Sequence, residues 1–206
     1  MTSPPASSRS GFHHGDLANA LLGEAHRLLN ERGVQGFSLR EAARAVGVSP
    51  NAAYRHFDDK SSLLAALARR GFAHMAARME EALDHAKAPL DRLKATGKGY
   101  LNFAREEPAL FELMFGPFGA GSGRDVTGVG PRSGLSPAEL LSQALDELVA
   151  AGLVSRDRRD GAEMLFWPAV HGLAVLVMAG ALKNGDDAAF EQMFRMLIPA
   201  LGVDQG

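Results

Sequence analysis

Apolar residues recur every three or four positions along almost the whole chain, and polar residues fill the positions between them. In the first of these stretches, Leu17, Leu21 and Leu28 fall on one side of a helix. The alternation with a period of two that is typical of half-buried strands does not occur in the sequence. This pattern predicts an all-α fold.

Helix-start and helix-stop residues divide the chain into nine expected helices. Ser38 and Glu41 have the spacing of a capping box, in which each side chain satisfies a backbone N–H of the other residue. Ser136 and Glu139 repeat this spacing, and Gly47 suits a helix end. The expected ranges are 14–32, 38–46, 49–57, 60–86, 89–107, 108–118, 136–152, 157 or 160 to 184, and 186–201.

The expected helices form two domains of three and six helices. We expect a disordered arm over residues 1–13, which are rich in Ser and Pro and lack the apolar segment of a signal peptide. A helix-turn-helix domain is expected over 14–60, and a larger helical domain over 61–206. The stretch from Gly119 to Gly134 holds six Gly and one Pro in 16 residues and predicts a long loop.

The segment VSPNAAYRHF, residues 48–57, places polar and aromatic side chains close to a helix start. Ser49 suits the N-cap and Pro50 the first helical position. Two short helices joined by a tight turn meet the description of a helix-turn-helix, whose second helix presents its first residues to the major groove. Asn51 is placed to pair with adenine, and Tyr54 to reach a phosphate. Packing of Tyr54 in a core is the alternative interpretation.

The charge distribution favours a polyanionic partner for the N-terminal third only. The whole chain has a formal net charge of -2. Residues 1–70 hold 9 Lys and Arg against 6 Asp and Glu, whereas residues 71–206 hold 13 against 18. The first part is therefore mildly basic and the second part acidic.

Four short sequences near the N-terminus form one combined motif of high specificity. They are GFS at 36–38, VGVS at 46–49, YRHF at 54–57, and Lys60 followed by Leu63-Leu64. On these residues the stretch from Gly15 to about His74 strongly resembles the DNA-binding domain of the TetR family of bacterial transcriptional regulators. FHHGDL at 12–17 and WPAVHGL at 167–173 are similar to motifs of one subset of that family, with Phe12 in place of Tyr.

The resemblance implies that the three N-terminal helices bind DNA and that the last two long helices, over about 160–202, form a homodimer interface. The family's phosphate-contacting positions fall on Ser38, Tyr54, His56 and Lys60. Its base-reading positions fall on Ser49, Pro50, Asn51 and Ala52. Two such heads about 34–36 Å apart would read a palindromic operator in double-stranded DNA.

Aromatic and Met residues are concentrated in the second domain. Each one alone is explained by packing in a core, but as a set they could line a cavity for an apolar or aromatic effector, with Trp167 and His171 as polar handles. The residues expected at the cavity are Phe103, Phe111, Met114, Phe115, Met164, Trp167 and His171. A bound effector would shift the population of conformations and change the spacing of the heads. No metal or cofactor is implied.

Other classes of protein are excluded or disfavoured. The chain has no Cys, so disulfides and thiolate zinc sites are excluded, and a cytoplasmic location is expected. Met164–Leu182 has no charged residue and approaches membrane-spanning length, but its Pro, His, Gly and Ala residues favour a helix buried by its own domain and a partner chain. The Gly-rich segments fit neither a P-loop nor a dinucleotide fingerprint, and no enzymatic activity is expected.

Three functions remain open. The main expectation is a ligand-responsive dimeric repressor. The same fold acting as an activator, or without small-molecule input, is the second. The third is a helical interaction protein that no longer binds DNA.

Overall fold

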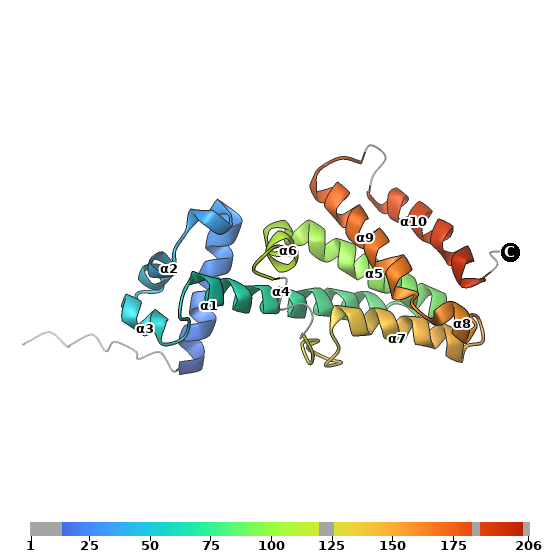
Figure 1. The fold of residues 1–206 in the computed structure, drawn as a ribbon, viewed down its shortest axis with the longest axis horizontal. Coiled ribbons are helices and arrows are strands. Elements are labelled where there is room, and N and C mark those ends of the chain that lie inside the picture. The colour runs from blue at the N-terminus through green and yellow to red at the C-terminus, as the bar shows by residue number, and fades with distance from the viewer. Residues whose placement is uncertain (1–13, 120–125, 183–185, 204–206) are drawn as a thin grey trace, which may run out of the picture. The chain divides into compact units, whose positions relative to one another are not determined.

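The computed structural model describes residues 14–119, 126–182 and 186–203, with side chains from residue 17. The expected arm over 1–13 lies outside these residues. Within them the fold is all-helical, as the sequence predicts (Figure 1). The helices are α1 (His14–Arg32), α2 (Leu39–Ala45), α3 (Pro50–Tyr54), α4 (Lys60–Leu83), α5 (Pro89–Glu106), α6 (Pro108–Phe115), α7 (Pro137–Ala150), α8 (Arg156–Arg159), α9 (Glu163–Met178) and α10 (Asp186–Leu197), with 3-10 turns η1 (Val34–Gly36) and η2 (Ile198–Leu201).

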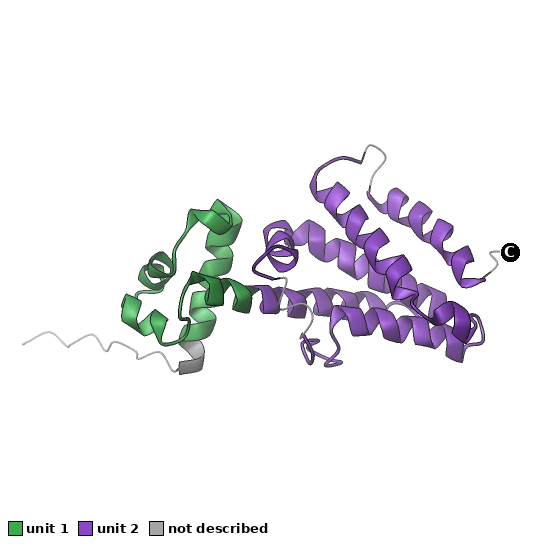
Figure 2. Cartoon of the chain, in the orientation of Figure 1, with its two compact units in different colours: residues 1–67 green, residues 68–206 purple. Residues whose placement is uncertain are grey.

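The chain divides into two compact units, unit 1 up to Leu67 and unit 2 from Ala68 (Figure 2). The division falls inside α4, whereas the sequence expectation places it at residue 60. Unit 1 has a core of Leu and Ala side chains from four helices. Its fully or almost fully buried members are Leu21, Ala25, Leu28, Leu29, Leu39, Ala42, Ala43, Ala53, Leu63, Leu64 and Leu67.

Helix α5 is the centre of unit 2, where it packs against both α7 and α9. It also comes close to the backbone of α4 at Gly99, where an added Cβ would lie 2.5 Å from Cα of Met79. No side chain fits at that distance, so the glycine permits the two helices to approach. Since Met79 of α4 is itself buried, this contact fixes the later part of α4 to the body of unit 2.

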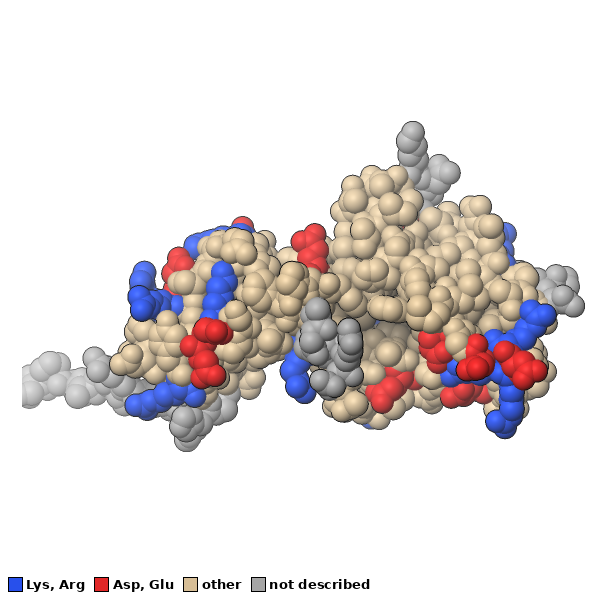
Figure 3. Space-filling view, in the orientation of Figure 1, with Lys and Arg blue, Asp and Glu red and all other residues tan. Residues whose placement is uncertain are grey.

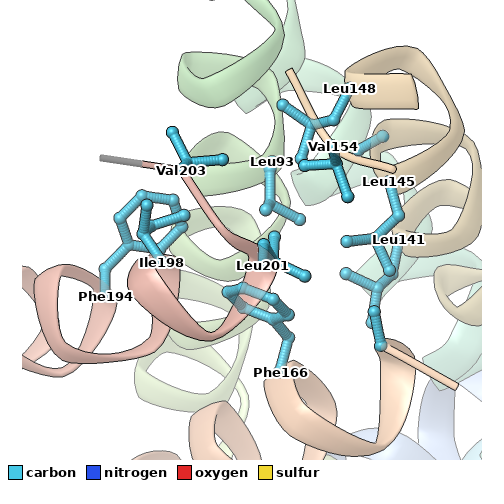
Figure 4. Packing of buried hydrophobic residues seen from close by; sticks show 12 residues of the cluster. Leu93, Leu141, Leu145, Leu148, Val154, Phe166, Phe194, Ile198, Leu201 and Val203 are labelled. Atoms are coloured by element: carbon cyan, nitrogen blue, oxygen red, sulfur yellow. The ribbon is translucent and has the colours of Figure 1, made fainter. Parts of the chain in front are cut away.

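A second group of buried residues closes the far end of unit 2 (Figure 4). Leu93 of α5 lies among side chains from α7, α9, α10 and η2, all less than a tenth exposed. The cluster consists of Leu93, Leu141, Ala144, Leu145, Leu148, Val154, Ala162, Phe166, Phe194, Ile198, Leu201 and Val203. Burial of apolar surface stabilises a fold by about 25 cal/mol per Å². Burial of these side chains therefore holds the C-terminal helices to the body of unit 2.

The long helix expected from 157 or 160 to 184 is interrupted at its beginning. The backbone turns at Gly161, whose φ of +70° favours glycine, and α8 and α9 form on its two sides. Helix α9 ends at Met178, and Gly180 has a φ of +64°, so the helix also stops earlier than expected. The uncharged run from Met164 to Leu182 continues past Gly180, so it does not reveal the stop at that glycine.

One segment of the described chain, Arg156–Met178, is apolar and long enough by composition to cross a membrane. The break at Gly161 leaves α9 as a continuous helix of 16 residues. At about 1.5 Å per residue this helix spans about 24 Å, less than the roughly 30 Å of a bilayer core. Its geometry therefore fits a helix at a protein interface better than a membrane span.

The outer side of α9 and α10 exposes large apolar side chains. Met164 and Met196 are 68% and 73% exposed, and Trp167, Val175 and Leu176 are also exposed. Figure 3 shows an uncharged area over α9 on the visible face. An exposed apolar surface of this kind is typical of a protein–protein interface.

Candidate nucleic-acid interface and ligand cavity

The angle between α2 and α3 is set by a short turn that requires a glycine. Gly47 has a φ of +80°. The N–H of Val48 donates to the carbonyl of Ala43, and the N–H of Gly47 donates to that of Arg44, at 3.0 Å in each case. These two bonds form a Schellman motif, which satisfies the last carbonyls of α2 and directs the chain into α3.

Both short helices begin with a serine cap. The Ser49 hydroxyl oxygen accepts from the N–H of Ala52 at 3.3 Å, and that of Ser38 accepts from Glu41 at 3.2 Å. The reciprocal half of the expected capping box is missing at Ser38, because Oε2 of Glu41 instead accepts the Ser38 hydroxyl at 2.9 Å. Glu41 also lies 3.6 Å from Arg32, whose guanidinium draws its carboxylate away from the backbone. The capping box at Ser136 and Glu139 is complete.

The expected DNA contacts lie on the surface of unit 1, around the N-terminal end of α3 and the beginning of α4. Ser49, Pro50, Asn51 and Tyr54 are exposed, whereas Ser38, Ala52, His56 and Lys60 are half-buried. The ammonium of Lys60 lies 4.8 Å from the centre of the Phe37 ring. This cation–π contact holds the lysine head beside the buried Phe37 while leaving it able to donate.

Three exposed arginines of unit 1 are absent from the expected contacts. Arg40 and Arg44 lie four residues apart on α2, and Arg55 follows α3. The helix periodicity of the sequence already indicates that these arginines are exposed, because they do not fall on the buried face of either helix. Figure 3 shows Lys and Arg side chains on the visible face of unit 1. Basic side chains on these two helices suit phosphate contacts.

Unit 2 contains a cavity of about 380 Å³, within the range of small-molecule sites. Helices α4, α5, α6, α7, α9 and α10 all contribute to its wall. The aromatic members are Phe72, Tyr100, Phe115, Phe166, Trp167, Phe190 and Phe194, and the Met members are Met75, Met79, Met114 and Met193. The wall is therefore predominantly apolar, and its polar groups come from a few positions.

The seven residues expected at the cavity are divided by the structure. Met114, Phe115 and Trp167 line it. Phe103 and Phe111 are 1% exposed and packed in the core. Met164 lies on the outer face of α9. His171 does not line the cavity itself but is hydrogen-bonded to Tyr100, which does. The sequence expectation does not include Tyr100 or the α4 residues, although their apolar helical spacing was visible.

Tyr100 connects the cavity wall to His171. Its hydroxyl lies 2.8 Å from Nδ1 of His171. The tautomer of His171 decides which of the two groups donates in this hydrogen bond. Burial raises the pKa of Tyr100 and lowers that of His171. Both groups are therefore mainly neutral at neutral pH.

Glu163 stands at the start of α9 and also lines the cavity. Arg159 holds it through two contacts, Nη1 to Oε2 at 3.0 Å and Nη2 to Oε1 at 2.9 Å. Burial opposes ionisation of Glu163, but hydrogen bonds led by that from Arg159 outweigh it and keep its pKa below the usual range. The carboxylate is ionised at neutral pH.

Both units of the chain match models of known protein families. A model described as bacterial regulatory proteins, tetR family, matches residues 21–67, and one described as tetracyclin repressor-like, C-terminal domain, matches residues 93–201. A solved structure of a protein of unknown function from Rhodococcus sp. RHA1 is 30% identical, with a TM-score of 0.73, and the match covers 92% of this chain and 100% of that one.

Two further comparisons give matches of different kinds, one with a solved structure and one with a curated sequence. The fatty acid degradation regulator FadR from Bacillus halodurans is 16% identical with a TM-score of 0.67, over 88% of this chain and 94% of its own. The nucleoid occlusion factor SlmA of Vibrio vulnificus is 30% identical over 111 residues, which are 54% of this chain and 55% of that protein. The chain thus spans about half the length of the curated relatives it matches.

The C-terminal model alone covers more than half of the chain, and the N-terminal model covers the helix-turn-helix. The chain therefore belongs to the tetR family of bacterial regulatory proteins, which are transcription regulators with a helix-turn-helix.

Proposed function

We propose that the protein is a cytoplasmic, ligand-responsive homodimeric repressor that binds a palindromic operator. Unit 1 binds the DNA: Asn51 reads a base edge beside Ser49, Pro50 and Ala52, while the phosphate contacts are Ser38, Tyr54, His56 and Lys60. Unit 2 binds the effector in its cavity. The outer face of α9 and α10, with its exposed apolar side chains, pairs with the same face of a second copy.

The observation that carries this proposal is the course of α4. Leu63, Leu64 and Leu67, near its start, belong to the core of unit 1. Phe72, Met75 and Met79, further along the same helix, line the cavity. A ligand that moves the cavity wall therefore acts on the helix to which the DNA-binding unit is covalently joined, and two heads on one operator respond to small changes in their spacing.

Operator affinity in the presence and absence of ligand tests the proposal. DNA from beside the protein's own gene is titrated at several salt concentrations, because release of counterions from phosphates gives a steep salt dependence. Effector saturation should weaken operator binding and leave binding to random DNA nearly unchanged. Unchanged operator affinity at saturation would reject ligand control. Tighter binding with ligand would favour an activator or co-repressor mechanism.

The relatives named nucleoid occlusion factors support a second candidate, a DNA-binding protein without small-molecule release. Its binding sites would be numerous and dispersed over the chromosome, whereas a local repressor has a few sites close to the genes it controls. A genome-wide map of bound DNA separates the two. Dispersed sites, with affinities that no cavity ligand changes, would support the second candidate.

A further inference from the structure

The wall of the cavity carries one formal charge among its described residues, the carboxylate of Glu163. Neither Lys, Arg nor His belongs to the described part of that wall. Burying a carboxylate or phosphate without a cationic partner costs several kcal/mol. The described wall therefore offers nothing to compensate an anionic ligand, and Glu163 would repel one.

The neutral polar groups of the wall are already used within the protein. The hydroxyl of Thr96 donates to the carbonyl of Leu93 at 2.7 Å, and the hydroxyl oxygen of Ser136 caps α7. The hydroxyl of Tyr100 is hydrogen-bonded to His171. Across the described chain, no buried side-chain N or O lacks a hydrogen-bond partner. A ligand that displaced these bonds would have to replace them, so the groups do not favour a highly polar ligand.

The first residues of α7 also line the cavity, and a helix N-terminus normally favours an anion. Here the position is occupied by the protein itself. The carboxylate of Glu139 accepts from the N–H of Ser136 at 2.7 Å, and Pro137 has no N–H to donate. The pKa of Glu139 lies below its usual range because of these bonds to Ser136. An anionic ligand would compete with a charge that is already in place.

The charged groups at the Glu163 end of the cavity have an excess of negative charge, because Arg159 pairs with more than one carboxylate. Besides Glu163, its guanidinium contacts Asp146 through Nε at 2.7 Å and the hydroxyl of Ser142 at 2.7 Å. One cation is thus shared by two carboxylates. Phe166 and Trp167, which lie three and four residues after Glu163, bring aromatic rings to the same part of the wall, and such rings attract cations.

We infer that the cavity selects a hydrophobic cation, an amine or quaternary ammonium group on an apolar body, and excludes carboxylates and phosphates. The cationic end lies toward Glu163, and the apolar body lies among the Phe and Met side chains. This inference rests on the proposed role of the cavity as the effector site, and adds the charge class of the effector to it.

Three probes with the same ten-carbon chain test the inference on the full-length protein. Decyltrimethylammonium, decanol and decanoate are titrated below their aggregation concentrations, by calorimetry and by the emission of Trp167, the single tryptophan of the chain. The cation should bind at least tenfold more tightly than decanoate, with decanol between them. Equal affinity for all three, or tighter binding of decanoate, would overturn the charge selection but leave the cavity as a binding site. Binding of none would reject the cavity's proposed role as well.

Two variants locate the selecting charge. Glu163→Gln keeps the size of the side chain and removes its charge, so the preference for the cation over decanoate should fall several-fold or vanish. Asp146→Asn removes the other carboxylate bound to Arg159 but leaves the charge of Glu163 in the wall, so the preference should fall by less than in Glu163→Gln. A preference that survives Glu163→Gln, or is lost equally in both variants, would contradict the assignment to Glu163. The comparison of probes on the unmodified protein stands even if a variant folds poorly.

Discussion

The hydroxyl of Tyr100 lies 2.8 Å from Nδ1 of His171, and this hydrogen bond joins α5 to α9. Trp167, whose ring centre lies 6.1 Å from that of His171, lines the cavity and is 43% exposed on the outer side of the same helix. The cavity and the exposed face of α9 are therefore only one side chain apart. A ligand that displaces Trp167 disturbs the surface through which we propose that two copies pair.

The half-buried position of His171 predicts a loss of stability in mild acid. Burial holds its pKa below the ordinary value of about 6.5, so the unfolded chain binds the proton more tightly than the folded chain. The free energy of unfolding should therefore fall as the pH drops below about 6.5, and this contribution should level off below the folded pKa. Urea unfolding between pH 7.5 and pH 5 measures the slope, above the range where most carboxylates titrate.

His171→Phe is the matching variant, since a phenyl ring can keep the stacking on Phe111, whose ring centre lies 5.3 Å from that of His171. The variant should be less stable at pH 7.5 because Tyr100 loses its hydrogen-bond partner, and its pH slope should be shallower. An unchanged slope would assign the acid sensitivity to another group.

Glu80 is a second buried group with a specific role. It is 4% exposed, and its carboxylate accepts from the backbone N–H groups of Arg132 and Ser133 at 3.3 Å and 2.9 Å. Glu80→Gln replaces charge-assisted bonds by weaker ones and should cost about 1–3 kcal/mol of unfolding free energy. Glu81→Gln, at the exposed neighbouring position, should change it by less than about 0.5 kcal/mol. Equal effects would show that Glu80 does not anchor the 130–133 segment.

Local sequence signals predict most of the fold, because helix periodicity, serine caps and glycine stops act within a few residues. The same signals cannot select cavity residues. Phe111 and Phe115 are four apart on one face of α6, yet Phe115 lines the cavity and Phe111 is packed in the core. Met164 and Trp167 are three apart on α9, yet only Trp167 reaches the wall. Small rotations of packed helices decide these outcomes, and they depend on distant parts of the chain.

Two glycines with open surroundings separate the effects of space and of backbone conformation. Gly23 lies inside α1 and Gly47 has a φ of +80°, and an added Cβ would meet nothing within 4 Å at either position. Gly23→Ala should stabilise unit 1 by about 0.5–1 kcal/mol, since alanine is the better helix former. Gly47→Ala should destabilise it by about 1–2 kcal/mol because of the left-handed conformation. Thermal unfolding of both variants measures the two changes in stability. Changes of the same sign would contradict the assignment of the Gly47 effect to its backbone conformation.

Asn51 and Tyr54 are exposed on α3 and should affect DNA binding in different ways. Asn51→Ala removes a proposed base contact and should cost about 1–3 kcal/mol on the operator and relax the preference at one base position. Tyr54→Phe removes a proposed phosphate contact and should weaken binding to operator and random DNA alike. Fluorescence anisotropy with both DNAs measures this. Equal losses on the two DNAs for Asn51→Ala would reject its role as a reader.

Charge placed on the outer face of α9 should separate the proposed dimer. Val175 and Leu176 are 45% and 47% exposed, and glutamate at either position would be buried without a partner in a dimer. Leu153→Glu, at a residue 42% exposed before α8, is the control, and it should leave the association unchanged. Sedimentation equilibrium measures the association directly.

A monomer makes half as many phosphate contacts as a dimer, so the slope of log affinity against log salt should fall by about half in the α9 variants. A full slope in a monomeric variant would mean that one head alone makes all the contacts, and the proposal of a paired, palindrome-reading protein would fail.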